Sequence, residues 1–232
     1  VDNLTVRDSY FGVKNYGTAN IEGYHAESID YEGIMNSGNL ILSSANISNA
    51  SGGIQSSGTL EVTNSNFSHV GTVISANSGE VLADNIVLNK VSVGLSSVAG
   101  VKFSASNISG DEVSLLIDVA NSDDFVLSSA EAIGDILAKS NDASQVKISD
   151  VEFVVANPGQ TPVVEQSCIG TCIIEDLVIY NSVRGISFTG NGNHMLANAK
   201  INAKQYGVRA ANYGSLLVDN VTVNSQHLSL IH

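Results

Sequence analysis

A repeat of about 21 residues runs along the chain and constrains its fold more than any other sequence feature. Eleven segments share one pattern, in which two apolar residues two positions apart precede a turn residue and a further apolar residue. Apolar residues two apart indicate a strand with one buried face, and so short a unit cannot enclose a core alone. Successive repeats must therefore stack on one another.

The turn position of the repeat holds Asn, Asp or Ser in nine of the eleven segments. These residues tolerate a left-handed backbone and hydrogen-bond locally, which suits a sharp bend. The column reads Asp8, His25, Ser44, Asn64, Asn85, Ala105, Ser129, Asp150, Asp176, Asn198 and Asn220. Because it breaks at His25 and Ala105, we expect an interrupted ladder of side chains. Its predicted members are Asn64, Asn85, Asp150, Asp176, Asn198 and Asn220.

A third strand in most repeats is marked by a glycine followed by an apolar residue, as in Gly33-Ile34 and Gly53-Ile54. A second glycine then closes the coil. Three short strands per turn predict an all-β fold, a parallel β-solenoid of about 11 coils that forms one domain over residues 1–232. Ankyrin, tetratricopeptide and leucine-rich repeats each need a helical run in every unit, and the closest candidate, residues 131–139, is short and contains Gly134.

Two stretches carry a resemblance to known proteins: GIQSSGTLEVTNSNF at residues 53–67 and GISFTGNG at residues 185–192. They resemble the repeats of right-handed parallel β-helix proteins, the pectate-lyase-like superfamily, and the repeats of bacterial and archaeal surface proteins. The resemblance covers nearly the whole chain and implies a right-handed, single-stranded β-helix. It implies little about function, because this architecture hosts polysaccharide lyases and hydrolases, adhesins, phage tailspikes and scaffolds.

The charge balance of 10 Lys and Arg against 23 Asp and Glu gives a formal net charge of -13. Nucleic-acid binding needs clustered cations, so we expect no nucleic-acid partner. No stretch reaches the roughly 18 apolar residues of a membrane helix, so we expect no membrane insertion. Solenoids normally end in polar caps, and neither end of this chain has one. We therefore expect flanking coils or domains of the same chain to cover the ends.

The repeat is interrupted between Phe153 and Ile173, where both prolines and both cysteines lie. We expect a protruding loop over residues 156–172. Cys168 and Cys172, with no His or further Cys nearby in sequence, offer too few ligands for zinc, so no metal site is expected. A local disulfide is favoured over two free thiols and would indicate an oxidising, extracellular or cell-surface location. Cys172 also falls on the inward column, so a buried small residue is the alternative.

Enzymes of the resembled superfamily use acidic clusters with calcium and a basic residue, or paired aspartates, on an outer strand face. The outward positions of the glycine-apolar strand are, by alternation, Lys14, Met35, Gln55, Ser75, Ser96, Leu116, Leu137, Glu165, Ser187 and Arg209. They form no carboxylate cluster, so we expect no catalytic site and no cofactor. One lyase hypothesis places Arg184 beside Glu175 and Asp176 to neutralise an acidic sugar, although Asp176 also belongs to the turn column.

Two segments at opposite ends of the chain echo each other, residues 11–17 and 206–214. The first presents Lys14 and Tyr16 near a turn, and the second presents Arg209 and Tyr213. Aromatic platforms often bind sugars, and stacking of tyrosines at solenoid corners is the alternative. The sequence therefore predicts a non-catalytic rigid surface module of the adhesin, stalk or surface-layer type, with carbohydrate or another cell-surface protein as partner. The alternative is a polysaccharide lyase or glycoside hydrolase domain.

Overall fold

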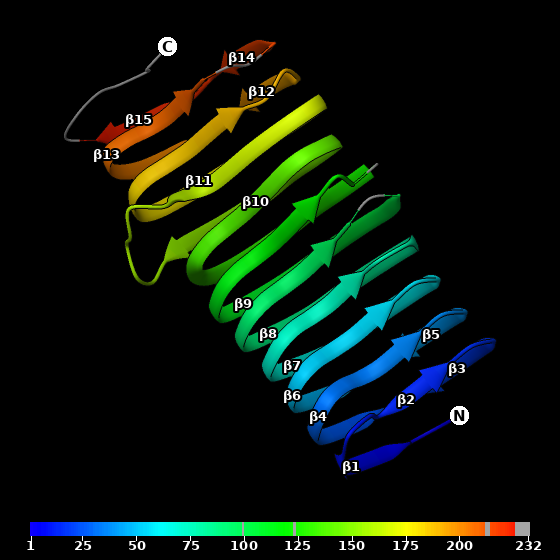
Figure 1. Ribbon diagram of the computed structural model, residues 1–232. Helices are drawn as coiled ribbons and strands as arrows, with labels where there is room; N and C mark the ends of the chain where they lie inside the picture. Colours follow the sequence, from blue (N-terminus) through cyan, green and yellow to red (C-terminus); the bar gives the residue numbers. More distant parts are fainter. Residues whose placement is uncertain (99, 123, 212–213, 226–232) are drawn as a thin grey trace.

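The computed structural model describes residues 1–98, 100–122, 124–211 and 214–225. This part of the chain is all β, without helix, and forms a parallel β-solenoid of about ten turns. Figure 1 shows the turns stacked from β1 (Thr5–Ser9) to β15 (Thr222–Ser225), which lie at opposite ends of the stack. The sequence prediction of the fold class is confirmed. Among the described residues we find no helix with the length and apolar character that a membrane crossing requires.

The strands lengthen towards the middle of the stack because the backbone keeps its pairing around the corners of each coil (Figure 1). Between β1 and β15 they are β2 (Val13–Asn15), β3 (Thr18–Glu22), β4 (His25–Asn36), β5 (Asn39–Ser43), β6 (Asn46–Ser56), β7 (Thr59–Ala76), β8 (Gly79–Ser97), β9 (Val101–Ala120), β10 (Asp124–Val155), β11 (Pro162–Thr189), β12 (Asn193–Ala197), β13 (Lys200–Ala210) and β14 (Ser215–Asp219).

Parallel register places equivalent residues of successive coils above one another. Ile34 pairs with Ile54, which pairs with Ile74, and all three are fully buried. The same arrangement buries Phe67 and Phe153 in the lumen, as the apolar alternation predicts. The core is thus a set of apolar columns parallel to the axis of the rod.

Within the described ranges, nineteen non-glycine residues at the corners of the coils have left-handed backbone, with φ between 49° and 58°. This conformation costs most L-residues about 1 to 2 kcal/mol, and least for Asn and Asp, which explains their enrichment at the turns. Of the predicted turn column, nine members have this backbone: Asp8, Ser44, Asn64, Asn85, Ser129, Asp150, Asp176, Asn198 and Asn220.

The backbone pairing corrects the predicted turn column at Ala105 and His25, the two positions where the column lacks Asn, Asp or Ser. Asp84 pairs with Ser106, so the residue above Asn85 is Asn107, whereas Ala105 lies in the core. Glu22 pairs with Ser43, so Gly23, with φ of 68°, takes the position predicted for His25. Both predictions were wrong by two residues, because a shift of two leaves the apolar alternation of a strand unchanged.

A second left-handed corner column begins at Asp8, which the sequence prediction had placed in the first. Ser9 pairs with Ile29 in the next coil, so Asp8 lies below Ser28. Successive members include Asp8, Ser28, Asn49, His69, Lys90 and Glu112. His, Lys and Glu are not typical left-handed residues, which is why the turn pattern did not reveal this column.

A buried polar column runs through the first coils of the rod. The side-chain amide of Asn15 donates to Oδ1 of Asn36 at 2.8 Å, and Asn36 donates to the hydroxyl of Ser56 at 3.1 Å. Each asparagine also accepts a hydrogen bond from the glycine that closes its coil, Gly17 or Gly38. A Cβ at Gly38 would clash with the carbonyl oxygen of Gly17, so the turn at Gly38 requires glycine, whereas a Cβ at Gly17 would meet no other atom.

The predicted protruding loop over residues 156–172 was wrong in extent. Among the described residues, the chain leaves the stack between β10 and β11, at residues 156–161 (Figure 1). β11 begins at Pro162. A proline at the first position of a strand removes no hydrogen bond from the interior of the sheet. Cys168 and Cys172 lie within β11 and are fully buried. The prolines correctly mark the loop, whereas the cysteines belong to the core.

Candidate functional site

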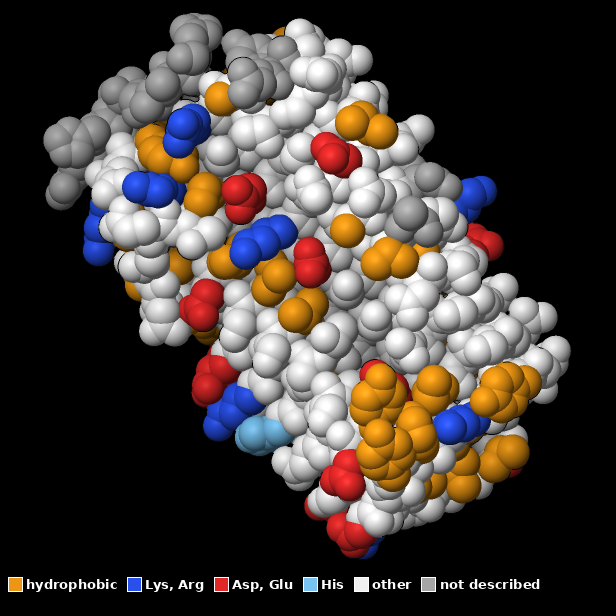
Figure 2. All heavy atoms as spheres, viewed as in Figure 1, with side chains coloured by type: hydrophobic (Ala, Val, Ile, Leu, Met, Phe, Trp, Pro, Cys, Tyr) orange, Lys and Arg blue, Asp and Glu red, His pale blue; other side chains and the backbone are white. Residues whose placement is uncertain are grey.

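The N-terminal aromatic cluster consists of Tyr10, Phe11 and Tyr31, with Lys14 beside it. The rings of Tyr10 and Tyr31 stack with centroids 5.8 Å apart and planes 10° from parallel. Phe11 meets both rings edge-on, at 4.7 Å from Tyr10 and 5.2 Å from Tyr31. Figure 2 shows hydrophobic side chains gathered on this end of the rod.

The stacking of the coils brings the cluster together. Tyr10 and Phe11 lie in the corner between β1 and β2, and Tyr31 lies in β4, one coil further along. The amide of Tyr31 donates to the carbonyl oxygen of Tyr10 at 3.1 Å, which sets the two tyrosines one above the other. Their separation of 21 residues equals one repeat, and this spacing is the signal by which the sequence could have revealed the pair.

The cluster is accessible to a ligand. Tyr10 is 60% exposed and Tyr31 is 42% exposed. The ammonium group of Lys14, one of the predicted binding residues, lies 3.7 Å from the centroid of the Phe11 ring, a cation–π contact. Tyr16, the other predicted binding residue of this segment, is 76% exposed on the same coil and makes no ring contact among the described residues.

The outward positions of the glycine-apolar strand differ from the prediction in two coils. Leu116 and Leu137 are fully buried, and the outward positions belong to Asp118 and Lys139. Asp118 pairs with Lys139, which pairs with Glu165, so three charged residues lie on consecutive coils. The prediction was again wrong by two residues, and the face carries more charge than expected.

A cluster of polar and aromatic groups lies at the C-terminal part of this face. The guanidinium carbon of Arg184 is 5.9 Å from the ring centroid of Tyr206, and Arg184 Nε donates to Gln205 at 3.0 Å. Gln205 donates in turn to Gln160 at 3.1 Å, which ties the loop of residues 156–161 to the rod. Arg184 therefore has a structural role.

Tyr206 is the titratable group of this cluster that could act as a proton donor or acceptor. Burial raises the pKa of its phenol, and the opposing effects of Arg184 and Arg209 do not cancel that rise. The phenol therefore stays protonated at neutral pH and does not serve as a general base. Of the predicted binding pair at this end, Arg209 is exposed, and Tyr213 lies outside the described residues.

The three residues of the lyase hypothesis are not brought together. Glu175 forms an ion pair with Lys147 at 2.6 Å, and Asp176 accepts a hydrogen bond from Asn198 at 3.1 Å. In the described part of the chain, no hydrogen bond or ion pair joins Arg184 to either carboxylate. Glu175, Asp176 and Arg184 each interact with a different partner on the solenoid surface.

The turn ladder consists of separate runs of hydrogen bonds. Asn85 donates to Asn64 at 2.7 Å, and Asn220 donates to Asn198 at 2.8 Å, extending the Asp176–Asn198 pair to three members. Asp150 has the left-handed backbone, but within the described ranges no bond joins it to another ladder member.

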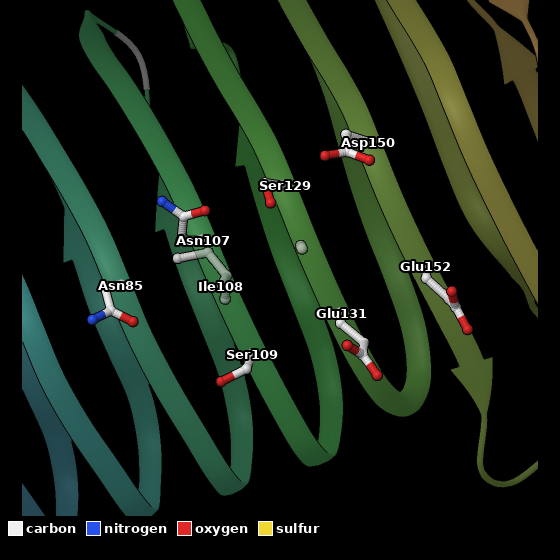
Figure 3. A pocket seen from close by; sticks show the side chains of 9 residues that line it. Asn85, Asn107, Ile108, Ser109, Ser129, Glu131, Asp150 and Glu152 are labelled. Atoms are coloured by element: carbon white, nitrogen blue, oxygen red, sulfur yellow. The ribbon is translucent and has the colours of Figure 1, made fainter.

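A shallow acidic groove of about 350 Å³ crosses four coils beside the turn column. Its carboxylates are Glu131, Asp150 and Glu152, with Glu131 and Glu152 on neighbouring turns (Figure 3). The sequence prediction considered only the glycine-apolar face and missed this cluster. Both glutamates are exposed, so the groove is open to water on the surface of the rod.

The predicted disulfide is confirmed between Cys168 and Cys172, whose Cα atoms are 6.3 Å apart. Register places Cys172 next to His194, and His194 next to Leu216, so all three occupy one inward column. His194 is only 2% exposed, and neither of its ring nitrogens has a hydrogen-bond partner among the described residues. The sequence analysis did not predict that this histidine would meet the cysteines, although Cys172 and His194 lie about one repeat apart.

The fold defines the chain as a parallel β-solenoid with an exposed aromatic cluster near its first coils. Comparison of the chain with protein-family models, with curated proteins and with solved structures gives no match.

Proposed function

We propose that the protein is a non-catalytic, rigid module of the extracellular or cell-surface space that binds carbohydrate through the N-terminal aromatic cluster. The observation that carries the proposal is the exposed stack of Tyr10 on Tyr31, with Phe11 set against both rings. Large aromatic side chains left in water are unfavourable, so a cluster of them at one place is typical of a binding surface.

The chemistry of the cluster suits a sugar. Tyrosines offer flat apolar faces for the C–H faces of a pyranose ring, together with phenol groups that hydrogen-bond to hydroxyls. Lys14 adds a cation at the edge of the cluster, which favours glycans that carry a carboxylate or sulfate. The chain itself has a net charge of -13, so this local cation offsets the repulsion of an acidic ligand.

Two further observations support a rigid module outside the cell. Backbone pairing links successive coils along the stack, so ligand sites on its surface keep a fixed spacing. The Cys168–Cys172 disulfide is typical of an oxidising compartment. The likeness of residues 53–67 to repeats of right-handed β-helix surface proteins agrees with this assignment.

The alternative is a polysaccharide lyase or hydrolase, and one observation favours it. The row of Asp118, Lys139 and Glu165 places acidic and basic groups on consecutive coils of one outer strand. The separation of Arg184 from Glu175 and Asp176, and the protonated state of Tyr206, support the non-catalytic function instead.

Binding would be tested by screening the purified protein against an array of neutral and acidic glycans, followed by calorimetric titration of the best ligand. Tyr10→Ala and Tyr31→Ala should each weaken binding about tenfold or more, because each removes one stacking ring. Tyr180→Ala is the matched control, since Tyr180 is also 42% exposed but lies in β11. Unchanged affinity in both cluster variants, or an equal loss in the control, would refute the proposal.

A further inference from the structure

A second group of side chains, inside the rod, is separate from the proposed glycan surface. The Sγ atoms of Cys168 and Cys172 and one ring nitrogen of His194 all lie within 4.8 Å of one another. All three residues are buried, at 2% exposure or less. Their convergence follows from the register of β11 with β12, which sets Cys172 beside His194.

His194 is the unexplained member of this group. A buried imidazole normally has a hydrogen-bond partner, because burying polar nitrogens without one costs free energy. Here both ring nitrogens lack one, and the Phe188 ring lies 5.1 Å from the imidazole. The backbone of Thr189 and Gly190 approaches the ring and favours its charged form slightly, but makes no hydrogen bond of normal geometry.

The surroundings of this histidine leave its ring nitrogens open to a metal ion. Neither nitrogen is used in a hydrogen bond among the described residues, and burial lowers the pKa of the imidazole. Two thiolates and one neutral imidazole are a donor set suited to Zn²⁺ or Cu⁺. Zinc holds sulfur at about 2.3 Å and nitrogen at about 2.0 to 2.1 Å, so two ligand atoms of one ion lie at most about 4.6 Å apart, close to the 4.8 Å that encloses these three atoms.

Gln166 is a further buried polar residue of β11, close to Cys168 in the sequence. It lies two residues before Cys168 on the same strand, so both side chains point into the lumen. It is 1% exposed, and neither its amide nitrogen nor its amide oxygen has a partner among the described residues. Gln166 and His194 are thus two buried side chains whose polar atoms have no partner in the part of the chain that the structure describes.

We propose that, when the disulfide is reduced, Cys168, Cys172 and His194 bind a zinc-like cation, with Gln166 Oε1 or a water as fourth ligand. A dithiol supplies the two electrons and two protons that convert the disulfide into two thiols, and is itself oxidised to a disulfide. Binding of the cation then releases the two thiol protons. The oxidised and metal-bound states exclude each other, because the same sulfur atoms form both.

Co²⁺ is the probe, because its thiolate complexes absorb in the near ultraviolet and its tetrahedral complexes absorb in the visible. The full chain would be reduced with a phosphine under anaerobic conditions, checked for β structure by circular dichroism, and titrated with Co²⁺. We expect one equivalent to produce the sulfur-to-cobalt band, Zn²⁺ to remove that band, and the oxidised protein to produce none.

Two histidine variants separate a built site from metal binding by loose thiols. His194→Leu should weaken Co²⁺ binding at least tenfold, and leucine suits the position because Leu216 occupies it in the next coil. His69→Asn is the control, since His69 is exposed at a corner far along the sequence. Absence of the sulfur-to-cobalt band from the folded, reduced wild type, or equal affinity in His194→Leu, would overturn the proposal.

A second measurement does not depend on any variant. Zn²⁺ should slow alkylation of the two thiols in the reduced wild-type protein at least tenfold, as judged by mass spectrometry of the modified cysteines. Alkylation at the same rate with and without Zn²⁺ would contradict the site.

Discussion

Asn15 donates its side-chain amide to Oδ1 of Asn36 at 2.8 Å, inside a rod whose core is mostly apolar. Asn36 also donates to Ser56 and to the carbonyl oxygen of Thr59, and accepts from the amide of Gly38. The column therefore joins neighbouring coils and shapes the turn that closes each one.

Replacing Asn36 by alanine should lower the free energy of unfolding by about 2 to 4 kcal/mol, because it leaves several buried hydrogen-bonding groups unpaired. Denaturation in urea measures this loss. Asn66→Ala, at an exposed asparagine, is the control and should change stability by about 0.5 kcal/mol or less. Equal effects of the two substitutions would show that the buried column contributes nothing specific.

Truncation of Phe153 tests the packing of the lumen. This ring is fully buried, and Phe153→Ala should cost about 3 to 5 kcal/mol, because it removes apolar contacts and leaves a cavity between neighbouring coils. Phe153→Leu keeps most of the volume and should cost less. A loss below about 1 kcal/mol in the alanine variant, measured by denaturant unfolding, would contradict an inward ring.

Asp84 should make stability depend on pH. Hydrogen bonds from Ser106 and Asn107, at 2.6 and 2.7 Å, lower the pKa of this carboxyl, and the smaller opposing effect of burial does not cancel them. A lowered folded-state pKa gives stability that is present above the ordinary carboxyl pKa and is lost as pH falls through the folded-state value. Asp84→Asn should thus be less stable than wild type at pH 7 and equal to it in strong acid. A pH-independent difference in melting temperature would refute this account.

The non-catalytic function predicts no turnover of polysaccharides. Pectin, alginate and other acidic glycans, incubated with the protein with or without calcium, should release no unsaturated products absorbing in the ultraviolet and no new reducing ends. The reason is that, among the residues that the structure describes, we find no buried acid and base placed together so that both could act on one glycosidic bond. Turnover by the wild type that is lost in Lys139→Ala would contradict the non-catalytic function and would identify Asp118, Lys139 and Glu165 as an active site.

The sequence was sufficient for the fold because every coil repeats the same alternation. Phe67 and Phe153 could be placed in the lumen from that pattern alone. Positions within a coil were less secure, since a shift of two residues keeps each side chain on its face. Ala105 and Leu116 were misplaced for this reason, and only the pairing of the backbone corrects them.

The sites were predicted less well than the fold, because each depends on which residues of different coils meet. Lys14 was found from a local motif, whereas its aromatic neighbours Tyr10 and Tyr31 lie one repeat apart and carry no local signal. Cys172 and His194 are separated by one coil that includes a glycine-rich turn, and their meeting is set by register alone.

Because the strands run across the rod, the hydrogen bonds between coils lie along its axis. Tension between the two ends would therefore peel coils away in succession, instead of shearing many bonds at once. Each released coil of about 21 residues would add on the order of 65 Å of contour length, from about 3.4 Å per extended residue less the spacing between coils. Under load, such a module would act as an extensible tether that yields in even steps, which single-molecule stretching would resolve.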